Sequence, residues 1–100
     1  MQINTESDGE TVTVSVDGEL DAHNCSHLGE AIRNAVAASG QSVVIEASAL
    51  RFIDSSAISE LLRARQEVTD RGGALSMRNV APSVRRVLEI TGLEDTFGVS

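Results

Sequence analysis

The sequence predicts an α/β fold in which a mixed, mostly parallel sheet of four to five strands is flanked by helices. Short runs of β-branched residues alternate along the chain with segments whose apolar residues recur at helical spacing. This alternation favours parallel strands, and an opening pair of extended segments joined at Asp8-Gly9 adds one antiparallel strand. With 100 residues we expect a single domain over residues 1–100, in the order β-β-α-β-α-β-α.

The first half of the chain contains the predicted hairpin and a first helix. Residues 11–17 alternate strictly between valine and polar residues, typical of a strand with one face on the core; the strand near residues 2–6 is less clearly specified. Asp21 follows the hairpin and is expected to cap a helix that stops at Ser39-Gly40. The apolar stripe of this helix consists of Cys25, Leu28, Ile32, Ala35 and Val36.

The middle of the chain predicts a second strand-helix unit. Val43-Val44-Ile45 is a continuous β-branched run, typical of a parallel strand covered on both faces. A loop over 47–51 leads to Phe52-Ile53, and Asp54 then precedes an amphipathic helix that closes at residues 71–73. The apolar face of this helix consists of Ala57, Ile58, Leu61, Leu62 and Val68.

The last third predicts one more strand and one more helix. Residues 74–77 are the strand, and Pro82 suits the first turn of a helix that Gly92 ends. We expect the tail to residue 100 to be partly helical. Since the chain has two Phe and neither Trp nor Tyr, we expect an aliphatic core.

The charge balance limits the classes of partner. Fifteen carboxylates against eight arginines give a net charge of −7, which disfavours nucleic acid and anionic membranes and favours a basic protein surface. The single cysteine forms no intramolecular disulfide, and the N-terminus lacks the pattern of a signal peptide. No apolar run approaches the roughly 18 residues of a membrane span, so we expect a cytoplasmic protein.

Signatures of catalysis are absent from the sequence, which contains no Gly-x-Ser-x-Gly elbow, no P-loop and no His-Glu-x-x-His. We therefore expect a protein that binds another protein and is not an enzyme, with no catalytic residue, cofactor or metal. His23 and His27 stand four apart on the expected first helix, as two metal ligands do, but two solvated histidines are commoner. Cys25 is expected to be a small core residue. A hydrolase with Ser55 as nucleophile stays an alternative, which turnover of an activated ester would reveal.

Asp54-Ser55-Ser56 follows a predicted strand and begins a predicted helix. The simplest interpretation is structural, with Asp54 as the cap and the serines in the first turn. The same arrangement exposes a hydroxyl where free amides and the helix dipole favour an anion. A phosphate on Ser55 adds about −1.5 to −2 charges, which the helix end accepts and a docked partner does not. The two interpretations are compatible, and the second predicts a switch between docked and released states.

Together these motifs resemble the STAS domain family, in particular the bacterial anti-sigma factor antagonists (anti-anti-sigma factors). The resemblance covers nearly the whole chain and is carried by the order and spacing of several motifs. These are Gly18-Glu19-Leu20-Asp21, Val43–Glu46, Phe52–Ile58, Leu61-Leu62, Gly72-Gly73, Pro82–Leu88 and Gly92-Leu93. In two places the chain departs from the family pattern. Ala57 stands where glycine is usual, so that a methyl group is expected to restrict the approach of a partner, and Glu46 stands where aspartate is usual.

The resemblance implies a STAS-like fold and a role in transcription regulation. Family antagonists bind an anti-sigma factor serine kinase of the histidine-kinase-like ATPase type and so release a sigma factor. The kinase, which supplies ATP and Mg²⁺, phosphorylates the serine after the motif aspartate, here Ser55, and a serine phosphatase restores binding. The resemblance places further residues at the partner contact: Asp21, Asp54, Ser56, Ala57, Ile58 and Ser59. An unphosphorylated STAS module that scaffolds or senses within a larger signalling or transport assembly stays an alternative.

Overall fold

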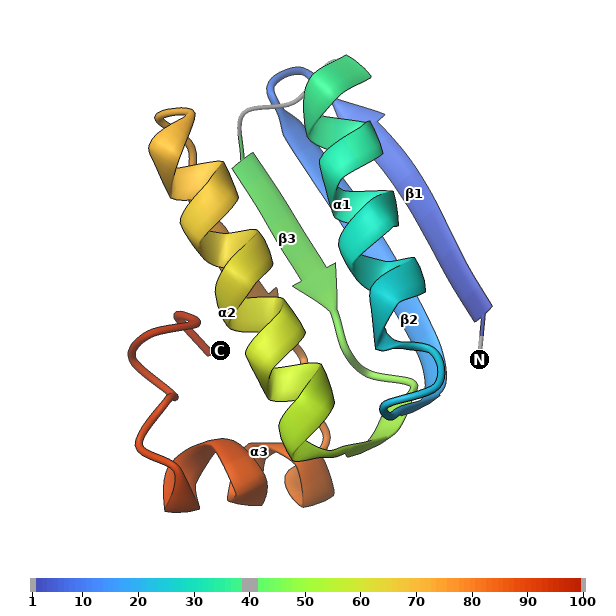
Figure 1. Ribbon diagram of the computed structural model, residues 1–100, viewed down its shortest axis with the longest axis vertical. Coiled ribbons are helices and arrows are strands. Elements are labelled where there is room, and N and C mark those ends of the chain that lie inside the picture. Colours follow the sequence, from blue (N-terminus) through green and yellow to red (C-terminus); the bar gives the residue numbers. More distant parts are fainter. Residues whose placement is uncertain (1, 39–41, 100) are drawn as a thin grey trace.

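The computed structural model describes residues 2–38 and 42–99, and Figure 1 shows their arrangement. Four parallel or antiparallel pairings join the strands into one sheet in the order β1-β2-β3-β5, with β4 paired to β2. Only β1 and β2 are antiparallel; β2–β3, β2–β4 and β3–β5 are parallel. The predicted mixed, mostly parallel sheet is thus confirmed. The elements are β1 (Gln2–Asp8), β2 (Thr11–Leu20), α1 (Cys25–Ala38), β3 (Ser42–Glu46), β4 (Leu50–Ile53), α2 (Ser55–Asp70), β5 (Leu75–Arg78) and α3 (Pro82–Ile90).

Helices α1 and α2 lie side by side over one face of the sheet and run in the same direction (Figure 1). Both are crossovers between parallel strands, so both begin at the edge of the sheet where β3 ends. Arg33 on α1 joins them through ion pairs with Glu60 and Glu67 on α2, at 2.8 and 2.7 Å. Among the described helices, none combines the length and the apolarity that crossing a membrane requires.

The alternation along β2 and β3 shows that helices cover one face of the sheet. Val12, Val14 and Val16 are buried, as their spacing predicts. In β3 the prediction of a strand covered on both faces is wrong, because Val44 is only half-buried while Val43 and Ile45 are buried. Three consecutive β-branched residues fit either arrangement, so the pattern could not distinguish them.

The strand before Asp54 begins earlier than the sequence predicted. Leu50–Ile53 forms β4 and pairs with the last residues of β2, whereas residues 50 and 51 were expected to belong to a loop. The change of partner along β2 occurs at Gly18, whose φ of 110° lies in a region that other residues rarely adopt. Its N–H donates to the carbonyl of Ala49 at 3.0 Å. This bend brings the end of β2 beside β4, and therefore beside the start of α2.

The first helix begins later than predicted. Asp21 does not cap α1, which starts at Cys25; its carboxylate instead closes a turn over residues 22–24. The predicted stop at Ser39-Gly40 lies outside the described residues. At α3, Pro82 occupies the first turn as predicted. Gly92 donates to the carbonyl of Glu89 and Leu93 to that of Leu88, which confirms the predicted glycine stop.

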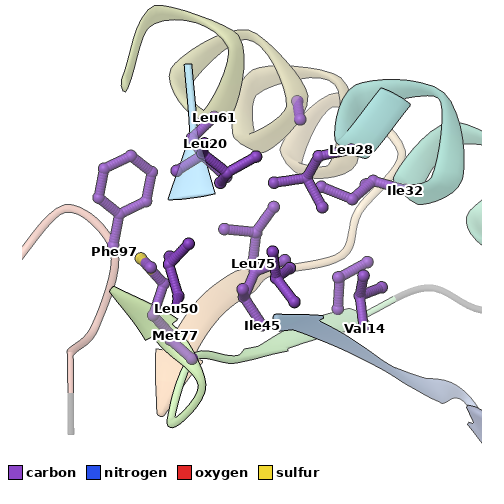
Figure 2. Packing of buried hydrophobic residues seen from close by; sticks show 14 of the residues in the cluster. Val14, Leu20, Leu28, Ile32, Ile45, Leu50, Leu61, Leu75, Met77 and Phe97 are labelled. Carbon is purple, nitrogen blue, oxygen red and sulfur yellow. The ribbon is translucent and has the colours of Figure 1, made fainter. Parts of the chain in front are cut away.

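The core lies between the two helices and the sheet, and Figure 2 shows Phe97 at one end of it. The core is aliphatic except for this ring, which is fully buried. Its backbone carbonyl accepts a hydrogen bond from the N–H of Met77 at 2.9 Å, along the free edge of β5. The prediction of a partly helical tail is wrong, because residues 91–98 form turns that bring Phe97 into the core.

Glu46 connects the ends of β3 and β5. Its carboxylate accepts hydrogen bonds from Arg78 Nε at 2.7 Å, Asn79 Nδ2 at 2.9 Å and the N–H of Ser48 at 3.1 Å. Burial alone would raise the pKa of Glu46, but the bonds from Arg78, Ser48 and Asn79 outweigh it and lower the pKa to about 2. The ionised form is therefore stabilised by folding.

We expect Glu46→Gln to lower the free energy of unfolding by about 1–2 kcal/mol at pH 7, since it removes a charge-assisted network whose arginine is half-exposed. Because the folded pKa lies below the unfolded one, the wild-type advantage is complete above about pH 5 and disappears as the pH falls towards 2. Urea unfolding of both proteins between pH 7 and pH 3 measures this. A difference that stays constant over this range contradicts the assignment.

Candidate functional site

The candidate site begins with the cap of α2. Asp54 has extended backbone angles, φ −106° and ψ −179°, and its Oδ1 accepts a hydrogen bond from the N–H of Ala57 at 2.9 Å. The N–H of Asp54 donates to the carbonyl of Leu20 at 3.2 Å, which ties the cap to the end of β2. The cap predicted from sequence is confirmed. It leaves Ser55 as the first residue of α2, exposed to solvent.

The second carboxylate oxygen of Asp54 reaches a distant segment of the chain. Its Oδ2 accepts a hydrogen bond from the N–H of Ala22 at 3.2 Å, 32 residues earlier in the sequence. Ala22 belongs to the turn that Asp21 closes, where Asp21 Oδ1 accepts from the N–H groups of His23 (2.9 Å) and Asn24 (3.2 Å). The structure therefore joins Asp21, Asp54 and Ser55 in one region, although they come from two separate connections.

The two first amides of α2 are available to an anion. Within the described residues, no hydrogen bond engages the N–H of Ser55 or of Ser56. These groups lie at the positive end of the helix dipole, a few ångströms from the Ser55 hydroxyl. Asp21 and Asp54 place negative charge on the neighbouring surface, so an added phosphate meets attraction from the helix end and repulsion from the carboxylates.

The residues that the family resemblance placed at the partner contact differ in accessibility. Ser56 and Ser59 are exposed, and Asp21 and Asp54 are partly exposed. Ala57 and Ile58 are buried, with 1% and 8% of their surface accessible. Both are core residues of α2, so their side chains support the exposed face from behind.

The methyl group of Ala57 points into the core and does not obstruct the surface above it. The expectation that it restricts the approach of a partner is therefore wrong. In the third position of α2, alanine favours the helix and fills core volume that glycine would leave empty.

We expect Ala57→Gly to lower the free energy of unfolding by about 1–2 kcal/mol, from lost helix propensity and a lost buried methyl. We expect the exposed surface around Ser55 to stay the same, because the Ala57 methyl group is buried. Chemical unfolding followed by far-UV circular dichroism measures the change in the free energy of unfolding. Ala64→Gly, at a second alanine on the same buried face of α2, is the control for the loss of a buried methyl from this helix. A stability unchanged from that of the wild type contradicts this assignment.

The two histidines do not share a helix face. His23 lies in the turn before α1 and only His27 lies within α1, so the predicted four-residue spacing on one helix is wrong. Across the described ranges, no cluster of three or more His, Cys, Asp or Glu side chains is arranged to hold a metal. Cys25 is half-buried against the core, and neither histidine is hydrogen-bonded to Ser55 in the part of the chain described.

The most enclosed groove on α2 lies far from Ser55. It has a volume of about 130 Å³ and is lined near the far ends of α1 and α2, by Ile32, Arg33, Val36, Ala64, Glu67, Val68 and Arg71. Pockets that hold small molecules usually have about 300–1,000 Å³. This groove is therefore smaller than a typical small-molecule site.

Two features of the site were missed by the sequence analysis. The side chain of Asn24 forms hydrogen bonds with the backbone of Asp21 and of Glu19, both before the 22–24 turn, and no local pattern distinguishes it from an ordinary turn residue. Phe52, on β4, keeps 49% of its surface exposed three residues before Ser55. A signal for Phe52 existed, since it is one of only two aromatic residues in the chain.

The sheet topology and the capped, exposed serine at the start of α2 are typical of a STAS domain. The family model of the STAS domain matches residues 2–100, and the chain belongs to this family. The anti-sigma F factor antagonist of Paenibacillus polymyxa is 29% identical over 97 residues, which cover 93% of this chain and 80% of that protein.

Solved structures show the same fold. An anti-sigma factor antagonist from Mycobacterium paratuberculosis is similar with a TM-score of 0.84 at 30% identity, over 98% of this chain and 83% of that one. The unphosphorylated form of the anti-sigma factor antagonist SpoIIAA gives 0.83 at 26% identity, over 99% and 88% of the two chains. The phosphorylated form of SpoIIAA, a Bacillus cell fate determinant, gives 0.76 at 25% identity, over 99% and 89%.

Proposed function

We propose that this protein is an anti-sigma factor antagonist that binds an anti-sigma factor serine kinase through the face around Ser55 and is released when Ser55 is phosphorylated. The observation that carries the proposal is the exposed Ser55 hydroxyl at the first position of a capped helix. Three of the relatives reported above are named anti-sigma factor antagonists, and one of these, SpoIIAA, has also been solved in a phosphorylated form. The proposed setting is the bacterial cytoplasm.

When the two proteins bind, the Ser55 hydroxyl has to face the ATP that the partner holds. The partner, an ATPase of the histidine-kinase-like fold, holds ATP and Mg²⁺. Ser55 Oγ forms a bond to the γ-phosphorus, the bond between that phosphorus and the β-γ bridging oxygen breaks, and ADP leaves with the bonding electrons. The hydroxyl proton passes to a base of the partner or to water.

The phosphate then separates the two proteins by charge. It adds about −1.5 to −2 charges beside Asp54. In the complex, the partner surface contacts a neutral hydroxyl at this position. The free amides of Ser55 and Ser56 accommodate the phosphate within this chain. A charge buried at an interface without an opposite charge beside it costs about 2–5 kcal/mol, which is enough to release the partner. A serine phosphatase that hydrolyses the ester resets the switch.

Phosphate mapping tests the proposal. The protein is incubated with the cognate anti-sigma kinase and ATP, and the modified residue is located by mass spectrometry. We expect one phosphate, on Ser55, and none on Ser56 or Ser59, which share its exposure and serve as internal controls. Modification elsewhere, or none, overturns the switch, and stable binding to a partner that is not a kinase supports the scaffold alternative instead.

A further inference from the structure

We infer that Asn24 is a positioning residue, which sets the place of Asp21 and of the Ala22 N–H relative to Asp54 and Ser55. Within the described residues, no hydrogen bond joins Asn24 to Ser55 or Asp54, so Asn24 acts through the turn to which it belongs. The consequence for docking rests on the proposed function. The structural part, that the Asn24 side chain helps to hold the turn together with the Asp21 carboxylate, does not rest on it.

The side chain of Asn24 reaches back across its turn and forms two hydrogen bonds with the backbone that precedes the turn. Its Oδ1 accepts from the N–H of Asp21 at 2.9 Å, and its Nδ2 donates to the carbonyl of Glu19 at 2.9 Å. In return, the Asn24 N–H donates to the carboxylate and to the carbonyl of Asp21, both at 3.2 Å. Asparagine supplies a donor and an acceptor in one planar group, and no apolar residue can replace either bond.

The turn is joined to the phosphorylation region through one backbone amide. The N–H of Ala22 donates to Asp54 Oδ2, while Asp54 Oδ1 caps α2 at Ala57. A displaced turn therefore withdraws Ala22 from Asp54 and moves the Asp21 carboxylate away from the surface around Ser55. The core is not involved, since Asn24 and Asp21 are only partly buried and Ala22 is exposed.

Backbone hydrogen exchange tests the structural part without any partner. In Asn24→Ala we expect the amides of Asp21 and Ala22 to exchange at least about ten times faster than in the wild type, with the amides of β2 and β3 unchanged. In Asn24→Asp the Asp21 amide keeps its acceptor and stays protected, although the bond to the Glu19 carbonyl is lost. Asn34→Ala is the matched control, because Asn34 is an exposed asparagine of α1 whose side chain has no hydrogen bond in the described residues.

Affinity for the anti-sigma kinase tests the docking part in the same three variants. We expect Asn24→Ala to bind at least about five times more weakly and Asn34→Ala to bind like the wild type. Unchanged exchange at Asp21 and Ala22 overturns the inference whatever the partner does. If the amides of Asp21 and Ala22 exchange faster in Asn24→Ala but its affinity equals that of the wild type, only the claim that the turn affects docking is wrong. If the wild type itself fails to bind the kinase, the proposed function is wrong, and the exchange rates still decide the role of Asn24.

Discussion

Replacing Ser55 by aspartate is expected to weaken binding of the anti-sigma kinase by about 30-fold or more. The substitution places a permanent negative charge at the start of α2, beside the carboxylates of Asp21 and Asp54, where the partner meets a neutral hydroxyl. Two kcal/mol correspond to about 30-fold in affinity, and the burial of an unpaired charge at an interface reaches this size. Isothermal titration calorimetry with the purified kinase, without ATP, measures the effect.

The affinities of three variants show whether binding depends on where the charge is placed or only on the net charge of the protein. Ser55→Ala should keep wild-type affinity within about threefold and accept no phosphate. Asn34→Asp carries the same net charge as Ser55→Asp but places it on the exposed side of α1, and should bind like the wild type. Wild-type affinity in Ser55→Asp, or an equal loss in Asn34→Asp, shows that charge at residue 55 does not govern docking.

Truncation of Phe97 to alanine is expected to cause a large loss of stability, about 3–5 kcal/mol. The ring is fully buried at one end of the core (Figure 2), although it belongs to a segment without helix or strand. Two hydrogen bonds to backbone carbonyls fix this segment: the Met77 N–H donates to the Phe97 carbonyl, and the side-chain Nε of Arg65 donates to the Thr96 carbonyl at 2.8 Å. Loss of the ring leaves a cavity and releases these bonds together. For a domain whose stability is about 5–15 kcal/mol, this is a large fraction.

The same truncation at the other phenylalanine provides the comparison. Phe52 is half-exposed, so Phe52→Ala should cost about half as much or less. Urea unfolding followed by far-UV circular dichroism measures both variants, since a chain without Trp or Tyr offers little intrinsic fluorescence. Equal losses for the two variants would show that Phe97 contributes no more to the core than a surface ring.

Prediction from sequence worked where a pattern depends on neighbouring residues. The valines of β2, the cap at Asp54, Pro82 in α3 and the stop at Gly92 follow from local geometry and are observed. It failed where an element depends on contacts from elsewhere in the chain. Strand β4 begins as early as Leu50 because the bend at Gly18 brings β2 beside it, and Phe97 is a core residue because β5 offers its free edge.

The candidate site likewise combines a local feature that the sequence predicts with contacts between distant segments that it does not predict. The sequence by itself determined that Ser55 follows a capping aspartate at the start of a helix, because capping involves residues only three positions apart. Only the tertiary structure decided that Ala22 N–H binds Asp54 and that Asn24 holds the turn next to it. It also decided that Ala57 faces inward. These contacts depend on how two connections meet at one edge of the sheet, and distances across 32 residues are set by packing of the whole domain and by no local pattern.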